Sequence, residues 1–200
     1  MIRLATFRYG ILWITSPIVA RRPAPYHRAA LKEPPMPQQT PPTNPIRPTD
    51  AEARALAQSL IREARFGALG TLDPDTGAPV VTRVALGPGP QGELLTFVSS
   101  LAAHTTALLR DRRAGLLLGE PGAKGDPLTH PRLSLQVEAH AIHRDDPAFP
   151  AMRERWLSDH PKSKLYIDLP DFFFFDLRAA SAALNGGFGR AFRLTPADLT

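Results

Sequence analysis

The chain has 200 residues, of which 43% are hydrophobic and 22% charged, and it contains no cysteine. This length and composition fit an ordinary globular chain with one core. The lack of cysteine excludes disulfides, thiolate metal sites and a cysteine nucleophile, and it is typical of a reducing, cytoplasmic setting. The net charge of +5 is concentrated at the N-terminus, because residues 1–48 hold seven Arg and Lys against one Glu. The remainder is close to neutral, so no nucleic-acid partner is expected.

Residues 1–48 are predicted to form a disordered, basic tail, because they hold ten of the 22 prolines. Their apolar stretch at 9–14 is too short to cross a bilayer, so no membrane partner is expected. Two interpretations of this end stay open: a weak targeting peptide, or an over-extended start with Met36 as the natural first residue. Residues 49–200 are predicted to form one folded domain.

The folded part is predicted to begin with an amphipathic helix. Thr49 and Glu52 fit a capping box, and apolar residues recur at helical spacing over 53–64. Four short strands are predicted next, at 66–72, 80–86, 93–99 and 115–119. The turn at 73–77 makes the first two a hairpin. Short strands at this spacing predict a mostly β fold that closes into a barrel with flanking helices.

Polar side chains follow the third predicted strand, where a short helix begins. Ser99, Ser100, His104 and Thr105 lie between this strand and an apolar run at 108–109. Hydroxyl groups at such a junction can hold an anion together with the unpaired N–H groups of the first helical turn. The segment is therefore a candidate phosphate site.

The second half of the chain predicts a long half-buried strand at 133–140, from strict alternation of apolar and polar residues. A helix is predicted at 146–159. Four consecutive phenylalanines, residues 172–175, place rings on both faces of a following strand, and we expect a subunit interface to cover the second face. A glycine-rich turn at 185–189 leads into a last strand.

Three motifs, FGALGTL (66–72), GDPLTHPRL (125–133) and LNGGFGR (184–190), occur within this order of elements. Together they resemble the FMN-binding split barrel of the pyridoxamine 5'-phosphate oxidase superfamily, in the branch of the haem-utilisation and CREG-like proteins. The resemblance covers about residues 50–196. It implies a homodimer with FMN at the subunit interface and a flavin-dependent oxidoreductase of unknown substrate, in which the flavin performs the electron transfer.

The resemblance also implies site residues. Arg83, followed by Val84 and Ala85, matches the family's strand that contacts the FMN phosphate, and Ser99 and Ser100 match its hydroxyl pair. His104-Thr105 stands where the pyridoxal-phosphate-producing enzymes have an Arg-Lys pair, and Pro88 stands where they have a Lys, so this chain has fewer cations for a phosphate. The predicted FMN-binding residues are Arg83, Val84, Ala85, Ser99, Ser100, His104 and Thr105. No catalytic residue and no metal site is assigned.

Haem is the alternative cofactor, and its iron ligand would be a histidine of the folded part. The candidates are His104, His130, His140, His143 and His160. A lone histidine is more often a surface or capping residue, and no two of these stand at ligand spacing. A third interpretation is a non-enzymatic, CREG-like dimeric barrel that binds neither ligand and whose pocket is filled by side chains. The structural alternatives for the site residues are a solvated strand residue for Arg83 and an ordinary helix cap for Ser99 and Ser100.

Overall fold

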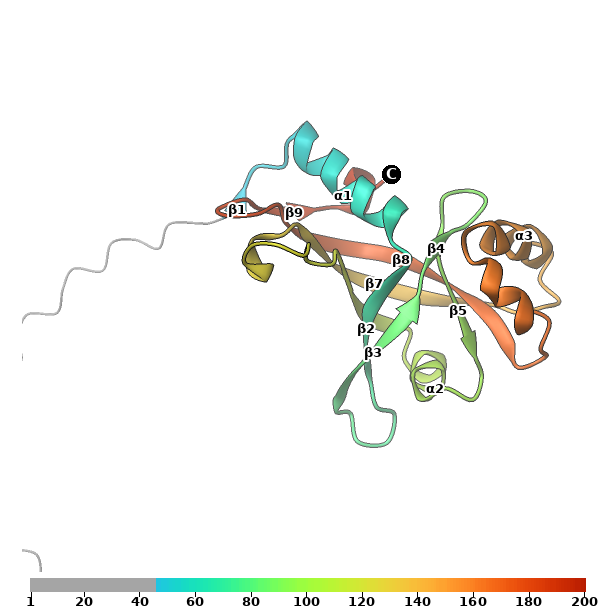
Figure 1. Cartoon of the computed structure of the whole chain (residues 1–200). Helices are drawn as coiled ribbons and strands as arrows, with labels where there is room; N and C mark the ends of the chain where they lie inside the picture. Colours follow the sequence, from blue (N-terminus) through green and yellow to red (C-terminus); the bar gives the residue numbers. More distant parts are fainter. Residues whose placement is uncertain (1–45) are drawn as a thin grey trace, which may run out of the picture. The chain divides into compact units, whose positions relative to one another are not determined.

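A computed structural model describes residues 46–200 as one mixed sheet with helices around it (Figure 1). The strands are β1 (Ile46–Arg47), β2 (Phe66–Leu72), β3 (Pro79–Ala85), β4 (Gly87–Pro88), β5 (Leu94–Ser99), β6 (Arg113–Leu118), β7 (Arg132–Ile142), β8 (Phe172–Asn185) and β9 (Ala191–Leu194). The α-helices are α1 (Ala51–Glu63), α2 (Ala103–Arg110) and α3 (Phe149–Asp159). Short 3-10 turns lie at Pro127–Thr129, Pro161–Leu165 and Pro196–Asp198.

The long strand β8 organises the sheet. The main strand order is β1-β9-β8-β7-β6-β2-β3, and β5 pairs with the first half of β8 and with β4. All these pairs are antiparallel except β1 with β9. A register shift between Gln136 and Val137 marks a bulge in the β7–β8 pair, and bulges of this kind bend a strand. The predicted β-barrel with flanking helices is confirmed.

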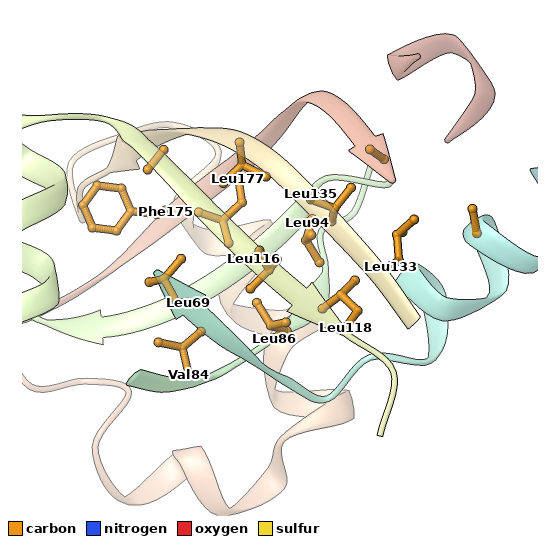
Figure 2. Close-up of a cluster of buried hydrophobic side chains, with 14 of the residues drawn as sticks. Leu69, Val84, Leu86, Leu94, Leu116, Leu118, Leu133, Leu135, Phe175 and Leu177 are labelled. Atoms are coloured by element: carbon orange, nitrogen blue, oxygen red, sulfur yellow. The ribbon is translucent and has the colours of Figure 1, made fainter. Parts of the chain in front are cut away.

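The first core fills the inside of this sheet (Figure 2). Alternate residues of each strand point inward, so the predicted apolar positions of β7 all face this core. Ala53 and Ala57 of α1 pack against the same cluster with no exposed surface. Side chains drawn in Figure 2 include Leu69, Val84, Leu86, Leu116, Leu118, Leu133, Leu135, Phe175 and Leu177.

The aromatic strand contributes to two cores. Phe173 and Phe175 belong to the first core, whereas Phe174 lies in a second core with Phe149 and Trp156 of α3. Phe174 has no exposed surface, because α3 and the turn after it cover that face of β8. The prediction that a subunit interface covers the second face is therefore wrong: the chain covers both faces itself.

The first helix has a different cap from the predicted one. Asp50 is the N-cap, and its carboxylate accepts a 2.8 Å hydrogen bond from the backbone N–H of Ala53. Thr49 instead donates through Oγ1 to the carbonyl of Arg193 at 2.7 Å. The predicted capping box of Thr49 and Glu52 is wrong, because the N-cap is Asp50, one residue after Thr49. Thr49 instead links the start of the helix to β9.

The predicted tail falls mainly on residues 1–45, which lie outside the described part of the chain. Within that part, Ile46 and Arg47 pair with β9, so the sheet begins before the predicted domain start at Thr49. No helix within residues 46–200 has both the length and the hydropathy needed to cross a bilayer.

Candidate cofactor site

The hydroxyl groups after β5 bond within the protein. Ser99 Oγ donates a 2.6 Å hydrogen bond to the carboxylate of Asp171 and accepts one of 3.1 Å from the N–H of Leu101. Thr105 is fully buried, and its Oγ1 donates to the carbonyl of Ser99 at 2.7 Å. Both side chains thus hold the turn from β5 into α2, and the hydroxyl proton of Ser99 is already used in the hydrogen bond to Asp171.

The charge at this corner is negative. Asp171 accepts from Ser99 through its carboxylate, and its backbone carbonyl accepts a 2.7 Å hydrogen bond from the N–H of Ser100. The Ser100 side chain is exposed. A phosphate on the Ser99 hydroxyl would meet this carboxylate at short range, which opposes binding. Asp171 could not be predicted as a partner of Ser99, because it lies 72 positions further along the chain and is marked in the sequence just by its position before the aromatic strand.

His104 lies in the first turn of α2 and lines a cavity of about 240 Å³. The cavity also reaches Thr71 of β2 and Val80 of β3, and the small side chains of Ala103 and Ala107 line it too. The His104 ring is half-buried, and this burial lowers the pKa of the imidazole below 6.5. Within residues 46–200 no hydrogen bond or ion pair engages its ring nitrogens, so His104 offers a neutral, free imidazole at neutral pH.

The other charges on this cavity come from the β2–β3 turn. Asp73 and Asp75 line it, and no Arg or Lys does among the described residues. Asp73 Oδ1 accepts from the N–H and the Oγ1 of Thr76, both at 2.8 Å, and these hydrogen bonds lower its pKa. The rim is therefore acidic, which disfavours a phosphate. From the sequence, Asp73 and Asp75 were predicted to be turn residues and not part of a site.

Arg83 points to the other face of the hairpin. Its neighbour Val84 lies in the first core with 5% of its surface exposed, and Ala85 packs against the second core. The Arg83 guanidinium is exposed and lies over the ring of Phe66, with Cζ 5.3 Å from the ring centroid. Alternate strand residues face opposite sides, so Arg83 points away from the side on which Val80 meets the His104 cavity. The two halves of the predicted phosphate site do not converge within one protomer.

A second cavity, of about 560 Å³, lies on the outer face of the sheet across β2, β3, β6 and β7. Gly70 and Gly115 leave room for it, and Val81 forms part of its wall. Arg113 stands at its edge, but its guanidinium donates to Asp111 and holds the pKa of that carboxyl at about 2. Gln136 and Glu138 also line the cavity, and the rest of its wall is mainly apolar.

Two of the remaining histidines are occupied by backbone groups. His130 Nδ1 accepts from the N–H of Gly122 at 3.2 Å, and its Nε2 lies 3.0 Å from the carbonyl of Lys124. His160 Nε2 lies 2.7 Å from the carbonyl of Leu86. Both rings hold loops in place. Both nitrogens of His130 are engaged, whereas His160 is engaged through Nε2.

His140 and His143 also differ from His104. His140 Nε2 lies 3.9 Å from the carboxylate of Glu138, and the exposed His143 ring packs against Phe173. Within the described part of the chain, His, Asp and Glu nowhere gather in threes as a metal site would need. Among the five candidate histidines, His104 alone combines partial burial, a lowered pKa and free ring nitrogens.

Comparison with known proteins is consistent with this architecture. The family model for pyridoxamine 5'-phosphate oxidase matches residues 53–185. A solved structure 49% identical aligns with 76% of this chain and 98% of its own, at a TM-score of 0.69. A protein of unknown function from Agrobacterium tumefaciens is 36% identical over 80% of this chain and 65% of its own, at a TM-score of 0.66.

A heme binding protein from Mycobacterium smegmatis is 29% identical over 77% of this chain and 61% of its own, at a TM-score of 0.65. This chain thus spans less than two thirds of the Agrobacterium and Mycobacterium proteins. No curated protein sequence matches. The family match covers well over half of the chain and agrees with its split-barrel fold, and the chain belongs to the pyridoxamine 5'-phosphate oxidase family.

Proposed function

We propose that this protein binds haem, with the His104 imidazole as a ligand of the iron. One observation carries the proposal: His104 is half-buried at the wall of a cavity, its pKa is lowered, and its ring nitrogens have no partner within residues 46–200. A neutral imidazole is the form that coordinates iron. Bound haem would supply a redox-active iron, and the protein would hold and orient it.

Two further points support haem over FMN. The relative from Mycobacterium smegmatis is described as a heme binding protein, at 29% identity. Among the described residues, Asp73 and Asp75 line the cavity beside His104 and no Arg or Lys does, and Asp171 engages Ser99. The residues predicted to hold the FMN phosphate therefore do not fit that group within one protomer.

The test is a titration of the purified full chain with haemin, followed by its Soret absorbance. We expect saturable binding by the wild type and at least a tenfold weaker affinity for His104→Ala. His143→Ala is the matched control, because that ring is exposed and lies in the loop after β7. Binding that His143→Ala weakens and His104→Ala leaves intact would reject the assignment of His104.

FMN binding, with flavin-dependent oxidoreductase activity, is the second candidate. It is favoured by Arg83, whose exposed guanidinium has no carboxylate partner among the described residues and lies beside the aromatic ring of Phe66. Arginine suits a phosphate because its planar fork donates to two oxygens. Titration with FMN, monitored at the flavin absorbance, tests it: Arg83→Ala should lose binding if this candidate holds, and a wild type that binds no FMN rejects it.

We further propose that the chain acts as a homodimer paired through the outer sheet face. Three apolar side chains on the strands that line the 560 Å³ cavity are exposed to solvent: Phe66 by 40%, Val81 by 70% and Leu117 by 42%. Apolar surface grouped in this way is typical of an interface. Light scattering after gel filtration should give twice the monomer mass, and Val81→Glu should give a folded monomer. A monomeric wild type would refute the proposal.

A further inference from the structure

The far end of the sheet, away from both cavities described above, holds a third cavity of about 310 Å³. It shares no lining residue with the His104 cavity or with the 560 Å³ cavity. Its polar lining consists of two arginines, a serine and an asparagine, namely Arg132, Arg193, Ser134 and Asn185. Among the described residues, no carboxylate lines it.

Strand register explains why these four side chains share one face. Ser134 of β7 pairs with Ala183 of β8, which pairs with Arg193 of β9. One step along the same face, Arg132 pairs with Asn185, which pairs with Ala191. The two arginines therefore stand at opposite corners of a patch, and the two alanines between them leave the space that the cavity occupies.

The donors of this patch are largely free. Within residues 46–200, no side-chain partner engages the guanidinium of Arg193 or the hydroxyl of Ser134. Arg132 uses one N–H group, which donates to the carbonyl of Leu128 at 2.8 Å. Asn185 uses its oxygen to accept from the N–H of Gly187 at 3.1 Å, so its NH₂ group remains a donor.

We infer that this cavity binds the phosphate group of a small phosphate monoester. Two guanidiniums and two neutral donors facing one space, without a carboxylate to neutralise them, favour a doubly charged oxyanion with several acceptor oxygens. The folded part is close to neutral overall, so this positive charge is local. Ile46, Ala183 and Ala191 supply apolar surface for the organic part of the ligand.

The probe is phenyl phosphate, titrated into the full chain by calorimetry at low salt. We expect saturable binding, an affinity at least tenfold lower for Arg193→Ala, and loss of binding for Ala183→Leu, which fills the cavity and keeps every charge. Ala183 is exposed, so this variant should fold. Arg112→Ala is the matched control, since Arg112 is an exposed arginine on the β6 side of the molecule. Equal weakening by Arg112→Ala would show a general charge effect and overturn the site.

Three comparisons sharpen the test. Benzoate should bind at least tenfold more weakly than phenyl phosphate, and equal affinity would overturn the phosphate class. Inorganic phosphate should bind more weakly because it lacks the ring, and equal affinity would overturn the monoester. Binding should strengthen from pH 5 to pH 7 as the phosphate gains its second charge near pH 6. The haemin affinity of Arg193→Ala should equal that of the wild type, so this site and the haem proposal fail independently.

Discussion

The hydroxyl of Ser99 donates to the carboxylate of Asp171 across 2.6 Å, and this bond ties the end of β5 to the residue just before β8. The same Asp171 accepts through its backbone carbonyl from Ser100. The pair therefore closes the β5–β8 edge. Ser99, which the sequence suggests as a ligand-binding residue, therefore has a structural role.

Ser99→Ala should destabilise the protein by about 1 kcal/mol, because a partly buried hydrogen bond is lost and the Asp171 carboxylate loses a donor. Urea unfolding measures this free energy. Ser100→Ala is the control, since its side chain is exposed, and it should change the free energy of unfolding by less than about 0.5 kcal/mol. Equal effects of the two variants would contradict a structural role for the Ser99 hydroxyl.

His104 should make stability depend on pH in one direction. Burial lowers its pKa in the folded state, so between 6.5 and that lower value the unfolded chain binds more protons than the folded one. The wild type should therefore lose stability as pH falls below about 6.5. His104→Gln removes the group and should lose less stability between pH 7.5 and pH 5.5. The free energy of unfolding of both proteins, measured at pH 7.5 and pH 5.5, tests this prediction. Equal losses of stability in the wild type and in His104→Gln would contradict it.

Gly67 is required by packing. A Cβ at this position would lie 2.9 Å from Leu86 Cδ1 and 3.0 Å from the carbonyl oxygen of Leu117. Gly67→Ala should cost about 1–3 kcal/mol, because the backbone oxygen cannot move aside without disturbing β6. At Gly115, by contrast, a Cβ would meet nothing within 4 Å, so Gly115→Ala should be nearly neutral. Chemical denaturation of both variants gives the comparison, and a neutral Gly67→Ala would show that this region repacks freely.

The ionised carboxylate of Asp198 should stabilise the fold at neutral pH, and this contribution should be lost in acid. Arg54 donates to its carboxylate at 2.7 Å and Thr195 donates from both its N–H and its hydroxyl, which lowers the pKa of Asp198 to about 2. A depressed carboxyl pKa stabilises the fold above the unfolded value near 4, and this contribution disappears as pH falls from 4 to 2. Asp198→Asn should therefore have a flatter decline of melting temperature over this range than the wild type. Glu154→Gln, an exposed change on α3, should decline like the wild type.

Most of the fold could be predicted because it depends on local patterns. Alternation over 133–140 predicted β7, and the helical spacing of apolar residues predicted α1. The aromatic strand was predicted too, but not what covers it. Phe174 is covered because the chain folds back and places α3 against β8, and no local sequence pattern predicts this long-range packing.

The candidate site was harder to predict because its partners are distant in the chain. The motif around Arg83 identifies a strand, but the face on which a side chain stands depends on register with β2. Five histidines look alike in the sequence. They differ only in the folded chain, where backbone groups bond to His130 and His160, Glu138 lies beside His140, and the exposed His143 ring packs on Phe173. His104 is half-buried, and its ring nitrogens have no partner among residues 46–200.

Because β8 sends alternate side chains into both cores, neither core can lose its packing while the other keeps its own. Calorimetric melting of residues 46–200 should accordingly give a single two-state transition, with equal calorimetric and van't Hoff enthalpies.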